Sequence, residues 1–243
     1  MAHDGLEPQR VARVVAALAA GEADPQRSLC RASARVVGVH SAGVVLILRG
    51  HALGTVCASD PVAESIEESQ FTLGEGPCVD AFSSREPVLV PDLAGAGGVR
   101  WPSFRERAIA EGVQAVFGFP LLVGPTCIGA LNLYNQRSGM LTDDQVANAA
   151  TVAHVAGRTV LSWQSVAGEG SLAWQLEHVP AHRAVVHQAT GMLSVQMAVD
   201  VDDALIMLRA YAFAEGRPIT AVSDDVVAGA LRFDDDASGA TLG

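Results

Sequence analysis

The sequence contains no lysine: its 16 basic residues are all arginine, and 27 acidic residues outnumber them. The formal net charge of −11 repels nucleic acid over most of the surface, so binding to RNA or DNA would need a local arginine patch. No uninterrupted apolar run approaches the roughly 18–20 residues of a transmembrane helix. Asp4, Glu7 and Arg13 place charges in the N-terminal stretch that do not fit a signal peptide. We therefore expect a cytoplasmic protein that makes no membrane contact.

Cysteine is scarce, and metal-binding patterns are missing. The chain has four widely spaced cysteines and no CxxC pair: Cys30, Cys57, Cys78 and Cys127. This spacing indicates neither a zinc site nor a disulfide framework. Three isolated histidines, none of them in an HExxH pattern, lie at His40, His51 and His154. No metal and no other cofactor is therefore expected.

Apolar residues are plentiful: 49% of the chain is hydrophobic and 18% is charged, which is typical of a folded globular protein. A chain of 243 residues accommodates one large domain, or a medium one and a small one. The first half alternates predicted helices (8–20, 24–38, 62–70, 78–84 and 101–111) with predicted strands (41–49, 52–59, 87–91, 114–123 and 126–135). This order predicts an α+β domain with an antiparallel sheet and helices packed on one face.

A long, mostly helical span is predicted over 142–197, between the two halves of the chain. Its apolar residues recur at alternating steps of three and four: Val146, Ala149, Ala153, Ala156, Val160 and Trp163. Such a stripe packs along its length, and one interpretation is that it pairs with the same helix of a second copy in a homodimer. The alternative is a helix that covers the sheet of its own chain.

The sharpest local motif of the first half is LGEGPC, residues 73–78. Gly74 and Gly76 permit positive φ and close backbone approach, and Pro77 suits the first turn of a following helix. Backbone amides at this helix start would cradle an anionic or polar ligand. The alternative is a tight structural turn that only connects two elements.

Four stretches, in this order, resemble the GAF domains of actinobacterial regulators: LGEGPCVDAF (73–82), PVLVPDL (87–93), Trp101-Pro102 and GFPLLVGPTCIGALNLYN (118–135). The resemblance covers about residues 24–166. It implies a five- or six-stranded antiparallel sheet with a small-molecule pocket on the face away from the dimer helices. The residues expected to bind this unidentified ligand are Gly74, Glu75, Gly76, Cys78 and Phe119.

Three further amphipathic helices are predicted over 181–197, 201–215 and 218–231. They resemble an ANTAR domain, the RNA-binding output module of certain transcription antiterminators, over about residues 172–233. The matching residues are Arg183, Val186, Ala189, Gly191, Leu193, Ala204, Leu208, Arg209, Tyr211, Ala212, Arg217, Ile219 and Val222.

The resemblance implies binding of an RNA hairpin. Arg183, Arg209 and Arg217 are the expected phosphate contacts, with Tyr211 and Phe213 as candidates for base stacking. The alternative for Tyr211 is a place in the three-helix core, and for each arginine it is a solvated face.

Several basic residues that are usual in the ANTAR family are replaced in this chain. Thr190 stands before the glycine of the first helix, where lysine is usual, and further basic positions are occupied by Phe213, Pro218 and Thr220. Residues 171–233 hold four arginines and seven acidic residues, a net charge of −3 before any histidine is protonated. An alternative function follows, in which the sensor acts through protein–protein contacts and its RNA-binding face is degenerate.

A thiol-based reductase of the GAF fold is a third hypothesis. Cys78 lies at a predicted helix start, where the pKa of a thiol falls and its reactivity rises, and Cys127 lies near a hairpin turn. The cysteine positions do not reproduce the pattern of that enzyme family, and buried free cysteines are common. We expect no enzymatic activity and no catalytic residue.

The expected organisation is an N-terminal helix (1–23), a GAF sensor domain (24–166), an ANTAR domain (167–233) and a disordered acidic tail (234–243). The expected function is a signal-responsive transcription antitermination regulator. In this hypothesis a small molecule or a partner protein shifts the linker helices of a homodimer, which changes how the ANTAR face meets an RNA hairpin.

Overall fold

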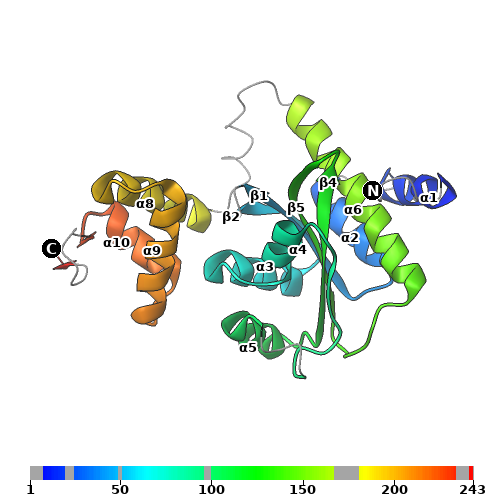
Figure 1. Cartoon of the computed structure of the whole chain (residues 1–243), viewed down its shortest axis with the longest axis horizontal. Coiled ribbons are helices and arrows are strands. Elements are labelled where there is room, and N and C mark those ends of the chain that lie inside the picture. Colours follow the sequence, from blue (N-terminus) through cyan, green and yellow to red (C-terminus); the bar gives the residue numbers. More distant parts are fainter. Residues whose placement is uncertain are drawn as a thin grey trace. The chain divides into compact units, whose positions relative to one another are not determined.

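The computed structural model describes residues 8–19, 25–48, 51–95, 100–166, 181–233 and 241–242. The chain divides into two compact units, Met1–Ser171 and Leu172–Gly243. The first contains an antiparallel sheet with flanking helices, and the second consists mainly of helices (Figure 1). The predicted fold class, an α+β domain followed by a helical domain, is confirmed.

A five-stranded sheet forms the centre of the first unit, in the order β2-β1-β5-β4-β3. Every pairing in it is antiparallel. The strands are β1 (Ser41–Leu48), β2 (His51–Ala58), β3 (Val88–Val90), β4 (Ala115–Val123) and β5 (Thr126–Asn135). The predicted hairpin is present, since β4 and β5 pair on either side of Gly124 and Pro125. Successive side chains of each strand point to opposite faces of the sheet.

One face of the sheet is covered by α1 (Pro8–Ala19), α2 (Pro25–Val37) and α6 (Asp143–Val166). The core on this side takes alternate residues of the central strands: Ala42, Val44, Leu46, Ala115, Phe117, Phe119, Leu121, Leu131 and Leu133. The apolar stripe of α6 is buried in the same core, at Ala149, Ala153, Ala156 and Val160. The stripe therefore covers the sheet of its own chain, and the interpretation of it as a dimer seam is wrong.

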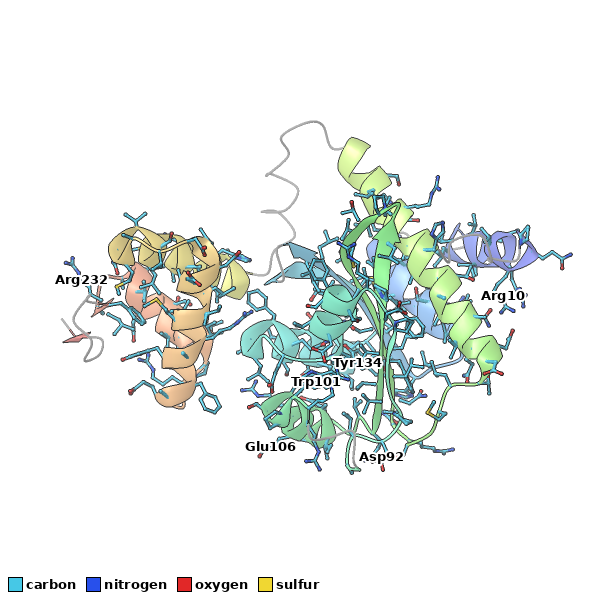
Figure 2. The ribbon with its side chains drawn as sticks, viewed as in Figure 1. Arg10, Asp92, Trp101, Glu106, Tyr134 and Arg232 are labelled. Atoms are coloured by element: carbon cyan, nitrogen blue, oxygen red, sulfur yellow. A yellow bond between two sulfur atoms is a disulfide. The ribbon has the colours of Figure 1, made fainter. Side chains whose placement is uncertain are left out.

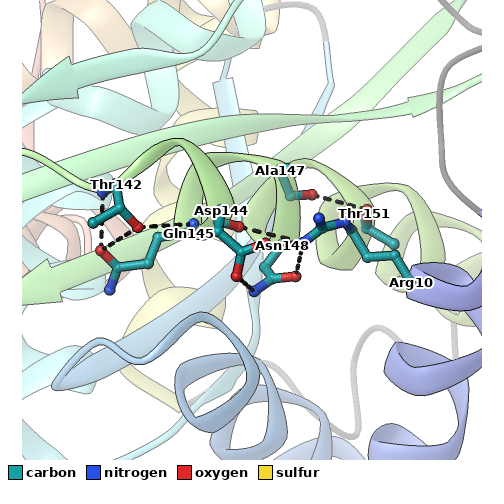
Figure 3. Close-up of polar contacts among 7 residues, drawn as sticks. All are labelled: Arg10, Thr142, Asp144, Gln145, Ala147, Asn148 and Thr151. Carbon is teal, nitrogen blue, oxygen red and sulfur yellow. Dashed lines mark hydrogen bonds and ion pairs between the residues drawn. The ribbon is translucent and has the colours of Figure 1, made fainter.

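The beginning of α6 is fixed by a capping box and by a contact with α1 (Figure 3). Thr142 Oγ1 accepts a hydrogen bond from the backbone N–H of Gln145 at 3.2 Å, and Gln145 Oε1 accepts one from the backbone N–H of Thr142 at 3.0 Å. Arg10 of α1 donates to Asp144 Oδ1 at 2.8 Å and to Asn148 Oδ1. The hydrogen bond from Arg10 lowers the pKa of Asp144. These contacts hold α1 against the first turns of α6.

A disulfide joins Cys30 of α2 to Cys57 of β2, with the Cα atoms 5.9 Å apart. The prediction that the cysteines indicate no disulfide is therefore wrong. The two residues lie 27 positions apart in the sequence and meet because α2 packs across the edge strand β2. Spacing along the chain gives no sign of this contact.

The opposite face of the sheet is covered by α3 (Pro61–Leu73), α4 (Pro77–Ser84) and α5 (Pro102–Ala110). Helices thus lie on both faces, and the prediction of a single covered face is wrong because both sides of the central strands are apolar. Asp60 caps the start of α3, because its carboxylate accepts a hydrogen bond from the N–H of Ala63 at 3.0 Å. Burial alone would raise the pKa of Asp60, but hydrogen bonds from the Ser59 hydroxyl and the Ala63 amide outweigh it and lower the pKa.

The second unit is built from α8 (Ala181–Met197), α9 (Val201–Ala214) and α10 (Ile219–Val227). Its apolar core is formed by Val186, Ala189, Leu193, Ala204, Leu205, Leu208, Ala212, Ile219, Val222, Val226 and Leu231. α10 ends before the predicted residue 231. Two short strands, β6 (Leu231–Arg232) and β7 (Thr241–Leu242), pair with each other, and β7 lies within the predicted tail 234–243, most of which falls outside the described residues. The part of the predicted helical span 142–197 that covers residues 167–180 falls outside the described residues.

Candidate functional site

Two polar side chains lie on the buried side of α3. Glu67 and Gln70 share this side with Ala63 and Ile66, and only 2% and 1% of their surfaces are exposed. The side rests on the sheet, where Tyr134 projects from β5 toward the helices (Figure 2). A carboxylate in such a place needs hydrogen bonds that offset its lost hydration.

The Glu67 carboxylate accepts hydrogen bonds from three neutral side chains. Asn132 Nδ2 lies 2.9 Å from both of its oxygens, and the Tyr134 hydroxyl donates to Oε1 at 2.8 Å. Gln70 Nε2 lies 3.3 Å from Oε2 and 3.0 Å from the Tyr134 hydroxyl oxygen. Gln70 Oε1 accepts the backbone N–H of Cys78 at 3.0 Å. These five residues, which we call the Glu67 cluster, connect α3, α4 and β5.

Two glycines allow the helices to approach the sheet closely enough to form the cluster. A Cβ on Gly43 of β1 would lie 2.8 Å from Glu67 Cγ and 2.7 Å from Cδ. A Cβ on Gly118 of β4 would lie 2.6 Å from the carbonyl oxygen of Pro77, in the first turn of α4. Real side chains do not tolerate such distances. The absence of side chains at these two positions therefore admits Glu67 and the start of α4.

Burial keeps the Cys78 thiol and the Tyr134 hydroxyl, the other two titratable groups of the cluster, in their protonated forms. It raises the pKa of Cys78 and of Tyr134 well above their usual values, and the negative charge of Glu67 raises both further. Tyr134 accordingly keeps its proton and remains a donor to Glu67. The prediction that a helix start lowers the pKa of Cys78 is wrong, because loss of hydration and the nearby carboxylate outweigh the helix amides.

The predicted ligand-binding motif at the start of α4 joins three helices. Gly74 ends α3 with a φ of 66°, and Gly76 precedes α4 with a φ of 139°. Glu75 Oε1 accepts the N–H of Phe104 in α5 at 2.8 Å. Cys78 is fully buried, and its N–H is bound to Gln70. An amide that was expected to cradle a ligand thus serves the protein's own packing.

Phe119 lies apart from the other predicted ligand-binding residues. It points into the core beneath α2 and α6, on the opposite face of the sheet from Glu67 and Cys78. The strand β4 is buried on both faces over Ala115–Leu121, so its unbroken apolar run does not reveal which residues face which side. The structure brings together residues 74–78, and it does not bring Phe119 to them.

The Glu67 cluster is rich in hydrogen-bond acceptors. Asn132 Oδ1 is buried and has no hydrogen-bond partner among the described residues. With the carboxylate of Glu67, it offers oxygens to a molecule that carries N–H or O–H groups. Within the described part of the chain, no three side chains of His, Cys, Asp or Glu gather closely enough to hold a metal ion.

Sequence reasoning missed the central residues of this cluster. Glu64, Glu67 and Glu68 indicate an ordinary polar helix when they are considered together. Two signals point to the cluster: Glu67 and Gln70 recur on the apolar side of α3, and Asn132 interrupts an otherwise apolar strand. A polar residue inside an apolar strand needs a buried partner, and Glu67 is that partner.

In the second unit, α9 carries an exposed stripe on the side away from its core. Ile206, Ala210 and Phe213 recur at steps of four and three, and Ile206 and Phe213 are 54% and 75% exposed. Arg209, which is partly buried, lies on the same side by this spacing. An exposed aromatic ring next to an arginine is the combination that stacks on unpaired bases and contacts phosphates.

The predicted RNA-binding residues have different surroundings. Arg217 forms an ion pair with Asp225 at 2.7 Å, and this hydrogen bond raises the pKa of Arg217. Tyr211 is partly buried and packs edge-on against Phe233, with ring centroids 5.2 Å apart. The side chain of Arg183 is not among those described.

Thr190, which stands where the ANTAR family usually has lysine, is 2% exposed. Its hydroxyl donates to the carbonyl oxygen of Val186 at 2.7 Å, one turn earlier in α8. Position 190 therefore belongs to the packed interior of the three helices.

Comparison with family models identifies one domain in each half of the chain. A family model described as "GAF domain" matches residues 19–160, and one described as "ANTAR domain" matches residues 174–227. Among curated proteins, no sequence matches significantly. Within the described ranges, every helix is too short or too polar to cross a lipid bilayer.

Solved structures with a similar fold include three bacterial proteins. The GAF domains of phosphoenolpyruvate-protein phosphotransferases from Acinetobacter and Coxiella burnetii are 13% and 11% identical, with TM-scores of 0.47 and 0.48; each match covers 65% of this chain and 94% of the other. The free methionine-R-sulfoxide reductase from Neisseria meningitidis, in complex with its substrate, is 14% identical with a TM-score of 0.46. That match covers 68% of this chain and 97% of the reductase.

Proposed function

Because the chain belongs to the GAF-domain family and also carries an ANTAR domain, we propose that it is a signal-responsive transcription antitermination regulator that binds RNA hairpins. The observation that carries this proposal is the pair of family matches, a sensor domain over 19–160 followed by an ANTAR domain over 174–227. Binding a hairpin in nascent RNA would favour the antiterminated transcript. The regulator would act in the cytoplasm, where RNA is transcribed in bacteria.

The RNA contact would use the exposed side of α9. Phe213 supplies an exposed ring for stacking, and Arg209 supplies positive charge beside it. Arg183 would add a phosphate contact from α8. Arg217 would contribute less than the family pattern implies, because Asp225 already neutralises part of its charge. Tyr211, which packs on Phe233, would support the shape of this side rather than stack on a base.

The sensing site would be the Glu67 cluster, with residues 74–78 as the segment that connects it to α4 and α5. A small molecule with N–H or O–H groups would donate hydrogen bonds to the Glu67 carboxylate, in place of those that Asn132 and Tyr134 donate to it now. Such a molecule would loosen α3 or α4 from the sheet. The cluster is not catalytic in this proposal, since the buried Cys78 thiol is protonated at neutral pH and therefore a poor nucleophile.

The active form would be a homodimer whose contact uses the outer side of the linker helix α6. The inner side of α6 is buried against the sheet, whereas Ala150, Arg158 and Ser162 are exposed. Pairing of two such helices would let a change in the sensor domain reach the segment that precedes the ANTAR domain.

The test is an RNA titration with the full-length protein and three variants. A fluorescent RNA with two small hairpins would be titrated with wild type, Arg183→Ala, Phe213→Ala and the control Val195→Ala, whose side chain is 83% exposed on α8. We expect Phe213→Ala to weaken binding about 5- to 100-fold, as the loss of one stacked base does. Arg183→Ala should weaken it as well, and the control should match wild type.

Two observations favour the alternative function, a sensor that acts through protein–protein contacts. The second unit places Arg217 in an internal ion pair and holds more acidic than basic residues over 171–233. Failure of wild type to bind the RNA at low salt would reject the antitermination proposal and favour this alternative.

A further inference from the structure

The Cys30–Cys57 disulfide occupies a sensitive place in the first unit. It links α2 to β2, which among the described residues is an edge strand that pairs with β1 alone. Cys30 is fully buried and Cys57 is 6% exposed, and both belong to the core that also holds the apolar stripe of α6. Breaking this bond therefore alters the packing of the core where α2, the sheet and α6 meet.

A stable disulfide conflicts with the proposed site of action. A regulator that acts on nascent RNA works in a compartment where thiol reductants keep cysteines reduced, and disulfides there are usually transient and redox-sensing. We propose that Cys30 and Cys57 form a reversible redox switch that sets how firmly α2 is held on the sheet. The assignment of a reducing compartment rests on the proposed function, whereas the position of the pair does not.

The chemistry needs only a disulfide of low molecular weight as oxidant. One cysteine thiolate attacks a sulfur of the oxidant, forms a mixed disulfide and releases the first thiol. The second cysteine then attacks its partner's sulfur, which forms the internal bond and releases the second thiol. Two protein thiols thus lose two electrons and two protons, and the oxidant gains them. A dithiol reductant reverses both steps.

Burial of the two sulfurs means that exchange requires a local opening. We expect the opening at β2, because it is an edge strand and no other strand of the described residues lies along its outer edge. Cys78 does not compete, since it lies with Glu67 on the opposite face. Cys127 lies at the turn of the β4–β5 hairpin, whereas Cys57 pairs with Val44 in the middle of β1. The switch therefore involves one defined pair.

Reduction would change the packing beneath α2. Bonded sulfurs lie about 2 Å apart, whereas unbonded heavy atoms prefer roughly 3.5–4 Å. The close-packed core has little spare space, so α2 and β2 must separate slightly to accommodate two thiols. α6 packs against α2 and is the last described helix before the second unit, so it can carry this displacement along the chain.

The experiment uses full-length protein equilibrated in mixtures of oxidised and reduced glutathione. Thiols are counted by a gel shift with a polymer-linked maleimide, and hydrogen–deuterium exchange reports on α2 and α6. We expect a reversible two-electron transition, faster exchange in α2 and α6 of the reduced form, and a melting temperature roughly 10 °C higher in the oxidised form. Cys57→Ser should match the reduced form in every buffer, and Cys127→Ser should respond like wild type.

Two results would overturn the switch. One is a pair that stays oxidised under dithiol reductants in the folded protein, or stays reduced in the oxidising mixtures. The other is equal exchange of α2 and α6 in both forms. Wild type supplies both measurements, so the conclusion does not depend on the folding of a variant. An RNA titration in each buffer separates the two proposals: absence of binding in both forms counts against antitermination alone.

Discussion

Gly43→Ala is expected to destabilise the first unit because it forces a methyl group into the Glu67 side chain. The new Cβ would lie 2.8 Å from Glu67 Cγ and 2.7 Å from Cδ, and nearer still to Oε1. The φ of Gly43 lies outside the left-handed region, so the backbone itself accepts alanine. The effect therefore isolates the steric contact between β1 and α3.

The magnitude follows from the two ways in which the protein can respond. If α3 and the strand move apart, overpacking costs about 1–3 kcal/mol. If Glu67 withdraws, the buried donors on Asn132 and Tyr134 lose their acceptor, at about 1–3 kcal/mol each. We expect a loss of about 2–3 kcal/mol in the free energy of unfolding, which lowers the melting temperature of a unit of this size by roughly 5–10 °C.

The assay is urea denaturation followed by circular dichroism, with Gly54→Ala as the matched control. Gly54 lies on the neighbouring strand β2, and a Cβ there meets nothing within 4 Å. This control should be neutral or should gain about 0.4–1 kcal/mol, since alanine restricts the unfolded chain. A Glu67→Ala background should remove at least 1 kcal/mol of the Gly43→Ala penalty. Equal penalties for the two glycines, or no effect of that background, would refute the steric argument.

Four further outcomes are expected. Tyr134→Phe should cost about 1–3 kcal/mol of unfolding free energy in urea denaturation, because Glu67 loses a buried donor; a loss below about 0.5 kcal/mol would contradict this. Asp60→Ala should lower the free energy of unfolding by about 1 kcal/mol near neutral pH, because α3 loses its N-cap. Since the pKa of Asp60 is lowered in the folded protein, this loss should shrink as the pH falls below the unfolded pKa of about 3.9. A loss that grows in acid would contradict this reasoning. In native protein Cys78 should resist iodoacetamide at pH 7.5, where rapid alkylation seen by mass spectrometry would argue against its burial. Phe213→Ala should leave the melting temperature within about 2 °C of wild type while it weakens RNA binding, since the ring is 75% exposed.

The sheet and most helices are predictable from the sequence because their signals are local. Turn residues such as Gly124 and Pro125 mark the hairpin, and the alternation of steps of three and four marks the α6 stripe. What packs on that stripe is not local information. The stripe packs against α1, α2 and the strands β4 and β5, and a second copy of the helix would satisfy the same pattern.

The candidate site was harder to predict because its residues come from separate elements. Glu67 resembles a solvated glutamate until Gly43, 24 positions earlier in the sequence, is placed beneath it. Cys30 and Cys57 likewise become a pair only after α2 docks on β2. The unbroken apolar run of β4 removes the alternation that would show which face of the sheet Phe119 occupies.

The central claim, that this GAF and ANTAR protein binds RNA through the arginines of its second unit, is tested most directly by the salt dependence of RNA affinity. Fluorescence titration of the two-hairpin RNA at several salt concentrations gives the slope of log K against log salt. Two or three arginine contacts predict a slope of about −1.5 to −3. A Kd that does not change with salt, or no binding at the lowest salt, would contradict the claim.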